Sequence, residues 1–447
     1  MSEDNGARRD RADGAARGAQ ASVKRMKSAA DAAAYQREWF AALRGRVSSG
    51  EPFAYVNADV PMEIFRAMDL PFVVNQWWAS LCSAKQMSGY LFGLMREEGF
   101  PDDICQYCAM SLATALDPKR DEGPWGGLPK PTIAVTRLAC DSLGKIFESF
   151  ADRIGIPFFP LESTVPTEVP DRWWERIHRH WDEFFEPHRL DLMVEELKSL
   201  IRFLEQTTGK AYSEQRLRRV MDLINEQETY YGLARDLIAK TRPAPAAITD
   251  TVPSVMIPQW HRGTRWGVES ARTFYEEIKG LVDRGESVCP NERARLMWIG
   301  RGLWFNLGFY QHFEKRYDAV FAWSMYLAIA ADGYLRYGSD PLRALASRFC
   351  GMEEFLHMPP WNCDWFVKEA KANGIDGAVY LIPENCTSAV EGSRFIVEAL
   401  EKAGVPVLTL RADPVDASKW NETEMRATVE SFLEGRLGLA PNRPADA

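Results

Sequence analysis

Two stretches of this chain repeat the same order of elements. The first is T-I-A-V-T-R-L-A-C (132–140), which leads through a helical pattern into G-I-P-F-F-P-L (155–161). The second is G-A-V-Y-L-I-P-E-N-C (377–386), which leads through another helical pattern into G-V-P-V-L-T-L (404–410). Each copy predicts an apolar strand, a cysteine just past it, a helix, a Gly-[Ile/Val]-Pro turn and a second strand. The repeat therefore indicates two related α/β lobes.

Other short apolar runs alternate with helical segments around both copies. Continuous apolar strands separated by helices are typical of βαβ units in a parallel sheet that is covered on both faces. From 173 to 241 the pattern is helical and charged, without a strand signal. The predicted fold class is α/β, with two related doubly wound parallel-sheet lobes joined by a helical middle segment. The predicted strands are 52–56, 72–75, 132–136, 157–161, 296–299, 319–323, 377–382 and 405–410.

The ends of the chain differ in composition from the rest. The Ala/Gly/Arg/Asp-rich stretch 1–35 is expected to be a mobile tail, with a helix start after about residue 24 as the alternative. Residues 438–447 are expected to form a second, solvated tail. The predicted parts between the tails are an N-terminal lobe at 36–190, a helical segment at 191–285 and a C-terminal lobe at 286–437.

Charge and composition exclude several classes of protein. Among 447 residues, 54 Lys and Arg stand against 63 Asp and Glu, so the formal net charge is −9. Such a chain lacks the basic surface that binds phosphates, and nucleic acid is not an expected partner. No uncharged apolar run is long enough to predict a membrane span, and no secretory signal pattern follows the first charges. The expected location is the cytoplasm, where thiols stay reduced.

The eight cysteines are too few for a disulfide scaffold and too scattered for a zinc ribbon. Cys105, Cys140 and Cys386 are predicted near the strand ends, where open parallel sheets bind ligands. Three thiolates there would leave one iron of a [4Fe–4S] cluster open, although the pattern alone leaves ordinary packing as the alternative. Cys108 forms a C-x-x-C pair with Cys105. The patterns around the remaining thiols are typical of buried or loop residues: Cys82, Cys289, Cys350 and Cys363.

Motifs for other chemistry are missing. The sequence has no G-x-x-x-x-G-K-[ST] loop, so the chain itself is not expected to bind a nucleotide. His178 and His180 would point apart on a helix and are not expected to bind a metal together. Several tryptophans are expected to anchor packing, with the alternative that some line a dry pocket for a planar substrate. These are Trp77, Trp78, Trp125, Trp260, Trp266, Trp361 and Trp365.

Four segments together resemble the 2-hydroxyacyl-CoA dehydratase / benzoyl-CoA reductase family. P-M-E-I-F-R-A-M (61–68) resembles its Pro-x-Glu-[Ile/Leu] segment, and I-C-Q-Y-C-A-M-S-L-A (104–113) resembles its first cysteine segment. L-A-C-D-S-L-G-K-I-F-E (138–148) is similar to its Ser-Cys-Asp segment, and D-G-A-V-Y-L-I-P-E-N-C (376–386) is similar to its third cysteine segment. The resemblance covers roughly residues 50–435.

The resemblance implies a metal cofactor. In that family three such cysteines hold a [4Fe–4S] cluster, and by position they are Cys105, Cys140 and Cys386. Gln106 stands where the family has Ser, and Cys108 adds a nearby thiol, which makes Cys108 the alternative to Cys105. Glu63 is the expected proton donor from its place in the first segment, with the favourable charge of a first helical turn as the alternative.

Three further segments look most like the larger cluster-bearing subunit of ATP-dependent benzoyl-CoA reductases: N-Q-W-W (75–78), P-W-G-G-L-P (124–129) and W-H-R-G-T (260–264). The resemblance then implies that an aromatic acyl-CoA is reduced to a cyclic dienoyl-CoA. It also implies a smaller homologous subunit and separate ATP-hydrolysing iron–sulfur activator subunits that supply low-potential electrons. The competing functions are a subunit of an (R)-2-hydroxyacyl-CoA dehydratase and a cluster-free scaffold subunit.

Overall fold

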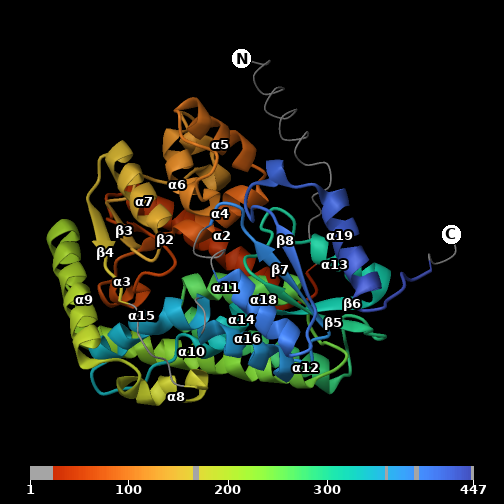
Figure 1. The fold of residues 1–447 in the computed structure, drawn as a ribbon. Helices are drawn as coiled ribbons and strands as arrows, with labels where there is room; N and C mark the ends of the chain where they lie inside the picture. The colour runs from red at the N-terminus through yellow and green to blue at the C-terminus, as the bar shows by residue number, and fades with distance from the viewer. Residues whose placement is uncertain (1–23, 165–170, 358–360, 387–391, 444–447) are drawn as a thin grey trace.

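The structure is a computed structural model that describes residues 24–164, 171–357, 361–386 and 392–443. Two four-stranded parallel sheets lie side by side above a layer of long helices (Figure 1). Every predicted strand run forms a strand, within two residues of its predicted bounds. The predicted α/β fold with two parallel-sheet lobes is therefore confirmed.

The first lobe carries its strands in the order β2-β1-β3-β4, all parallel. Its strands are β1 (Ala54–Val56), β2 (Phe72–Val74), β3 (Ile133–Arg137) and β4 (Phe158–Leu161). Its helices are α3 (Met62–Ala67), α4 (Asn75–Ala84), α5 (Ser88–Glu97), α6 (Gln106–Leu116) and α7 (Asp141–Ile154), with short 3-10 turns η1 (Arg120–Glu122) and η2 (Pro124–Gly126).

The second lobe repeats this arrangement in the order β6-β5-β7-β8. Its strands are β5 (Ala294–Ile299), β6 (Ala319–Ser324), β7 (Gly377–Ile382) and β8 (Val407–Arg411). Its helices are α13 (Phe309–Tyr317), α14 (Met325–Asp332), α15 (Pro341–His357), α16 (Trp361–Ala372), α18 (Ser393–Lys402) and α19 (Glu422–Gly435), with the 3-10 turn η4 (Ala417–Lys419).

The Gly-[Ile/Val]-Pro turns occupy equivalent places in the two sheets. Gly155 ends α7 with φ of 66°, and Gly404 follows α18 with φ of 87°. Both angles lie in the left-handed region that glycine adopts without steric cost, so each glycine lets the chain turn back into the last strand of its sheet. The repeat seen in the sequence is thus a repeat of structure.

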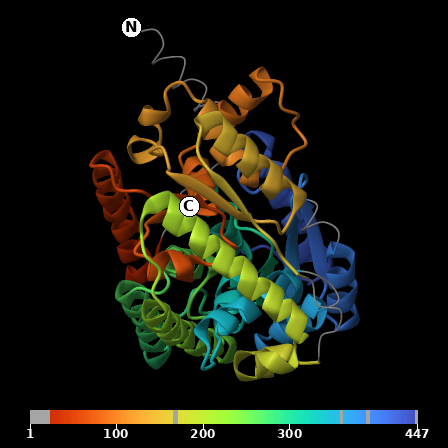
Figure 2. The ribbon, with the colours of Figure 1, turned by 90° about the vertical axis from the view of Figure 1, so that its left-hand side faces the viewer.

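The third part is helical. Its elements are α2 (Lys27–Ser48), α8 (Trp173–His180), η3 (Trp181–Glu183), α9 (Pro187–Thr208), α10 (Glu214–Lys240), α11 (Ile248–Trp260) and α12 (Arg265–Asp283). In Figure 1 α10 and α12 run below the two sheets, α2 and α11 lie in the middle between them, and α9 stands at the left beside β4. The boundary predicted at 190/191 falls inside α9, which starts earlier and lies alongside β4 and α15 (Figure 2). The helical segment is therefore longer at its start than predicted.

Each predicted tail contains described residues that pack against the rest of the chain. Helix α2 begins inside the predicted 1–35 tail, and Ala29 and Ala32 are fully buried where α2 packs against α11 and α12. The small side chains that made this stretch look mobile let the helices approach closely. At the other end, the backbone N–H of Asn442 donates to the carbonyl of Arg316 at 2.6 Å. Part of the predicted C-terminal tail therefore lies against the second lobe.

One hydrophobic core joins the lobes. It contains Val135 of the first sheet together with Ala378 and Tyr380 of the second sheet. Among the described residues, no helix is both long and apolar enough to cross a membrane.

Candidate functional site

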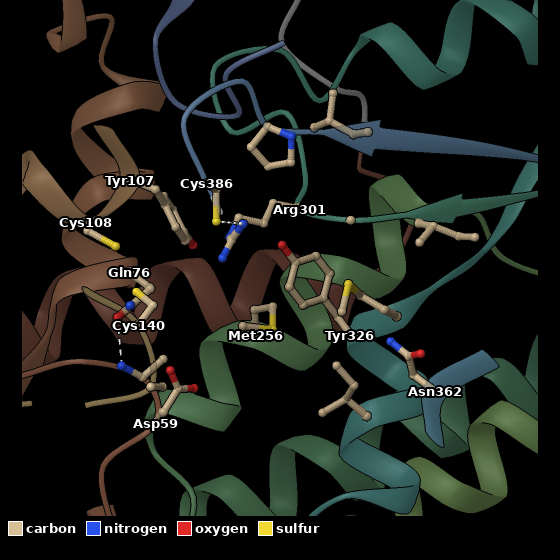
Figure 3. Close-up of a pocket in the computed structure, with 18 of the residues that line it drawn as sticks. Asp59, Gln76, Tyr107, Cys108, Cys140, Met256, Arg301, Tyr326, Asn362 and Cys386 are labelled. Atoms are coloured by element: carbon tan, nitrogen blue, oxygen red, sulfur yellow. Dashed lines mark hydrogen bonds between the residues drawn. The ribbon is translucent and has the colours of Figure 1, made fainter. Parts of the chain in front are cut away.

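A cavity of about 200 Å³ lies between the carboxyl ends of the two sheets, and both lobes and helix α11 line it (Figure 3). In open parallel sheets, ligands bind beyond the carboxyl ends of the strands, at the point where the strand order reverses. In these sheets that point lies between β1 and β3 and between β5 and β7. The cavity is therefore at the position where doubly wound sheets bind ligands.

The first lobe brings three thiols and a carboxylate to this region. Cys140 is the extended residue between β3 and α7, and Cys105 has the same place in front of α6. Cys108 lies in the first turn of α6. Asp59 follows β1 and accepts a hydrogen bond from Nδ2 of Asn57 at 3.1 Å. Cys108, Cys140 and Asp59 line the cavity, whereas Cys105 lies behind its wall.

The second lobe completes the opposite wall. Cys386 follows β7, Arg301 follows β5, and Tyr326 lies in the first turn of α14 after β6. Nη1 of Arg301 donates to Sγ of Cys386 at 3.3 Å, which Figure 3 draws as a dashed line. The hydroxyl of Tyr326 accepts a hydrogen bond from the backbone N–H of Gly302 at 2.9 Å. These contacts place a guanidinium and a phenol beside the thiols.

The four cysteines nearest the cavity form one connected group. Hydrogen bonds link the Cys105 thiol to those of Cys108 and Cys386, and another links Cys108 to Cys140. The order of contact is therefore Cys386, Cys105, Cys108, Cys140, and it crosses from one lobe to the other. The predicted convergence of Cys105, Cys140 and Cys386 is seen in the structure, together with Cys108 as the thiol between them.

These contacts also change the acidity of the thiols. Hydrogen bonds from Cys108 and Cys386 outweigh burial and hold the pKa of Cys105 well below its usual value. The hydrogen bond from Cys108 likewise lowers the pKa of Cys140, against the effect of burial. The bonds that Cys108 makes to Cys105 and Cys140, together with burial, raise its own pKa. The group therefore favours thiolates at Cys105 and Cys140.

The remaining cysteines lie outside the group. Cys82 is fully buried, and burial raises the pKa of its thiol. Burial also raises the pKa of Cys289 to about 12, and its thiol donates to the carbonyl of Glu314 at 3.6 Å. Cys350 donates to the carbonyl of Arg189 at 3.8 Å, and Cys363 is half-buried. None of the four lines the cavity, in agreement with their predicted packing roles.

Glu63 is placed elsewhere. Its carboxylate pairs with Arg348 and, at 3.3 Å, with Arg262, and its side chain is 1% exposed. Burial alone would raise the pKa of Glu63, but the guanidinium groups of Arg348 and Arg262 outweigh it, so the pKa lies below its usual value. Glu63 lines a separate, smaller pocket instead of the large cavity. This geometry indicates a structural ion pair, and the predicted proton-donor role has no support from it.

The tryptophans mainly pack. Trp77 and Trp125 surround Phe40, Trp266 stacks on Tyr35 at 3.6 Å, and Trp260 lines the cavity. The Trp361 side chain lies outside the described residues.

Sequence reasoning missed three cavity residues of chemical interest: Asp59, Arg301 and Tyr326. Each lies two or three residues past the carboxyl end of a predicted strand, and that place was the signal available to find them.

The donor set is compatible with an iron–sulfur cluster. Such clusters are held by cysteine thiolates, here four thiols that are more than half buried beside a cation. Within the described ranges, no three His, Cys, Asp or Glu residues converge closely enough to bind a single metal ion. The thiols are instead linked in pairs along a line, and a cluster, unlike a single ion, distributes its thiolates over several irons.

Comparison with known proteins shows which proteins this sequence is similar to. The family model described as "2-hydroxyglutaryl-CoA dehydratase, D-component" matches residues 57–435. The chain is 20% identical over 393 residues to the (R)-2-hydroxyisocaproyl-CoA dehydratase alpha subunit of Clostridioides difficile, covering 86% of this chain and 90% of that one. It is 20% identical over 388 residues to the (R)-phenyllactyl-CoA dehydratase alpha subunit of Clostridium sporogenes, covering 86% and 89%.

Proposed function

The chain belongs to the family of the 2-hydroxyglutaryl-CoA dehydratase D-component, and from this membership we propose that it is a subunit of a 2-hydroxyacyl-CoA dehydratase. The observation that carries the proposal is the connected group of four thiols from both lobes, beside a cavity at the strand ends. The benzoyl-CoA reductase function expected from the sequence becomes the second candidate, because the names of both relatives are those of dehydratases.

We assign the thiols to a [4Fe–4S] cluster. Cys140 and Cys386 supply one ligand from each lobe, and Cys105 supplies the third, with Cys108 as its alternative. When bound there, such a cluster would supply low-potential one-electron chemistry. Three protein ligands would leave one iron accessible from the cavity, into which Cys108, Cys140 and Cys386 face.

The protein's own groups then act on the substrate. Dehydration removes hydroxide from carbon 2 and a proton from carbon 3; a base on the protein takes the proton and passes it on, so that the two together make one molecule of water, and the electron is recovered in the same turnover. Asp59 is the one carboxylate among the described residues that line the cavity, so it is placed to receive the proton. The apolar walls, which include Leu143, Met256 and Ile329, keep bulk water away from the reduced thioester.

The cavity fits an aromatic or bulky apolar acyl group. Aromatic side chains make up a large part of its wall: Tyr107, Trp260, Tyr326, Tyr334, Phe366 and Tyr380. One relative is named for (R)-phenyllactyl-CoA, whose acyl group carries a phenyl ring. A thioester of this kind agrees with the aromatic acyl-CoA expected from the sequence.

The same aromatic wall is the observation that favours the second candidate. A benzoyl-CoA reductase adds two electrons and two protons to the ring and yields a cyclic dienoyl-CoA. Because the electrons stay in the product, it needs a stoichiometric reductant, and the resemblance implies an ATP-hydrolysing partner that delivers those electrons. In either case we propose a smaller homologous subunit and a separate activator as partners; the alpha-subunit names of both relatives support the presence of a further subunit.

A turnover assay separates the candidates. The chain is produced without oxygen together with the proposed smaller subunit and activator, and iron and sulfide are measured first. We expect bound iron, and conversion of (R)-phenyllactyl-CoA to the enoyl-CoA with only catalytic reductant. Conversion of benzoyl-CoA with stoichiometric reductant, and none of phenyllactyl-CoA, would assign the reductase instead. A complex that turns over while this chain holds no iron would leave it as a scaffold.

A further inference from the structure

Arg301 has a charge without a carboxylate partner in the described part of the chain. Its guanidinium is half-buried at the cavity wall between the lobes, donates to Cys386 Sγ at 3.3 Å and lies 5.3 Å from the centre of the Tyr107 ring. Withdrawal from water alone would lower the pKa of Arg301, but the thiols of Cys386 and Cys105 outweigh this effect and raise the pKa. A cation withdrawn from water needs a compensating anion, and the groups that supply one here are cysteine sulfurs.

The backbone around Arg301 holds this cation in place. Gly300 has φ of 99°, and a Cβ built there would lie 2.5 Å from the carbonyl oxygen of Leu381, so the turn after β5 requires glycine. The indole N–H of Trp298 donates to the carbonyl of Arg301 at 2.9 Å. On the other side, the N–H of Gly302 donates to the Tyr326 hydroxyl at 2.9 Å. The guanidinium is therefore directed at the thiols by contacts on both sides of its own residue.

We propose that Arg301 is a positioning residue that sets the reduction potential of the cluster held by the four-thiol group. The proposal rests on the proposed function, since it assumes that the thiols bind a cluster. Cluster potentials depend on net charge, on hydrogen bonds to the sulfurs and on solvent exposure. A reduced cluster has one more negative charge, so a fixed cation and an N–H···S hydrogen bond stabilise the reduced form more than the oxidised form.

The geometry also makes Arg301 a link between the two lobes. Cys105, Cys108 and Cys140 come from the first lobe, and Arg301 and Cys386 come from the second. The positive charge that balances the thiolates of the first lobe is therefore supplied by the second lobe. The charges of the site are balanced only when both lobes contribute to it.

The test compares three full-length variants in the complex with its partner subunit, loaded with iron and sulfide without oxygen. R301Q removes the charge, and R301K keeps the charge but loses the planar set of N–H donors. R394Q is the matched control, because the Arg394 side chain is 84% exposed on α18 of the same lobe and pairs with Glu398. Iron per chain and the midpoint potential, followed by the EPR signal of the reduced cluster, are measured for each.

We expect R301Q to lower the equilibrium constant for one-electron reduction at least tenfold, which is about 59 mV. R301K should lower this equilibrium constant by a smaller factor, and R394Q should leave both the constant and the midpoint potential unchanged. An unchanged potential in iron-loaded R301Q would overturn the proposal. If R301Q does not load iron, R301K decides in its place, and a wild-type potential there would overturn it. Wild-type protein without iron would instead overturn the proposed function, and the role of Arg301 with it.

Discussion

The two lobes share one strand order but differ in the charge that follows their first strands. The chain leaves β1 and reaches Asp59, and it leaves β5 and reaches Arg301; both side chains line the same cavity. The cysteines are more alike, because Cys140 follows β3 and Cys386 follows the equivalent β7. The common topology thus explains why thiols from distant segments meet. The divergence between the lobes places an acid on one wall and a cation on the other.

The largest expected effect comes from removing the thiol that each lobe places after its third strand. C140A and C386A should each abolish cluster binding and reduce turnover to background, because each removes one of the three proposed ligands. Iron analysis and the turnover assay check this. C363S is the matched control, since Cys363 is half-buried in the second lobe and outside the cavity. Full iron content in C386A would mean that the first lobe binds the cluster alone.

The next comparison is within the first lobe, between Cys105 and Cys108. Cys105 touches Cys386 across the lobes, whereas Cys108 touches only thiols of its own lobe among these four cysteines. We therefore expect C105A to lose at least half of the bound iron and C108A to retain it, with an altered EPR signal from its changed surroundings. The reverse result would make Cys108 the ligand.

The next prediction concerns Asp59, the acid that the first lobe places on the cavity wall, in contrast to Arg301 of the second lobe. D59N should lower kcat by about 100-fold, which is within the range for removal of a general base, while iron content stays at the wild-type value. Steady-state kinetics and iron analysis check this. D141N is a suitable control, because Asp141 is an exposed residue in the first turn of α7 beside Cys140. A D59N enzyme with normal kcat would remove Asp59 from the mechanism.

The smallest effect on activity is expected at Glu63, which lies away from both walls. E63Q leaves Arg262 and Arg348 without their anion and should lower the free energy of unfolding by about 3 kcal/mol at pH 7, measured by urea denaturation. Turnover should change by no more than a few-fold. E398Q, at a 57% exposed side chain, serves as the control.

The pH dependence of the Glu63 contribution has a definite sign. Its pKa in the folded protein is lowered, so its stabilising effect is fully present above the unfolded value of about 4.3 and is lost as the pH falls through the folded value. The difference in stability between wild type and E63Q should therefore shrink below about pH 4. A stable E63Q protein that has lost its activity would restore Glu63 as the proton donor.

The local sequence pattern was sufficient to predict the strands, the duplicated sheets and the positions of two of the cysteines. Apolar runs with flanking Gly and Pro predict every described strand, because strand formation depends on alternation and burial within a few residues. The repeat of Gly155 and Gly404 indicates the duplicated sheets, because glycine is needed where φ is positive. The place of Cys140 and Cys386 just past their strands puts them at the ligand-binding edge.

Tertiary contacts determine the features of the site and of helix α2 that the sequence pattern did not predict. No local pattern shows that Cys105 meets Cys386, that Arg301 lies among the thiols, or that Glu63 is buried between two arginines from other segments. Likewise, α2 is ordered by burial of Ala29 and Ala32 against α11 and α12, although its composition is typical of a mobile tail. Such contacts join residues that are far apart along the chain. Local periodicity reports which face of an element is buried, and it has no information on which distant side chain is buried against it.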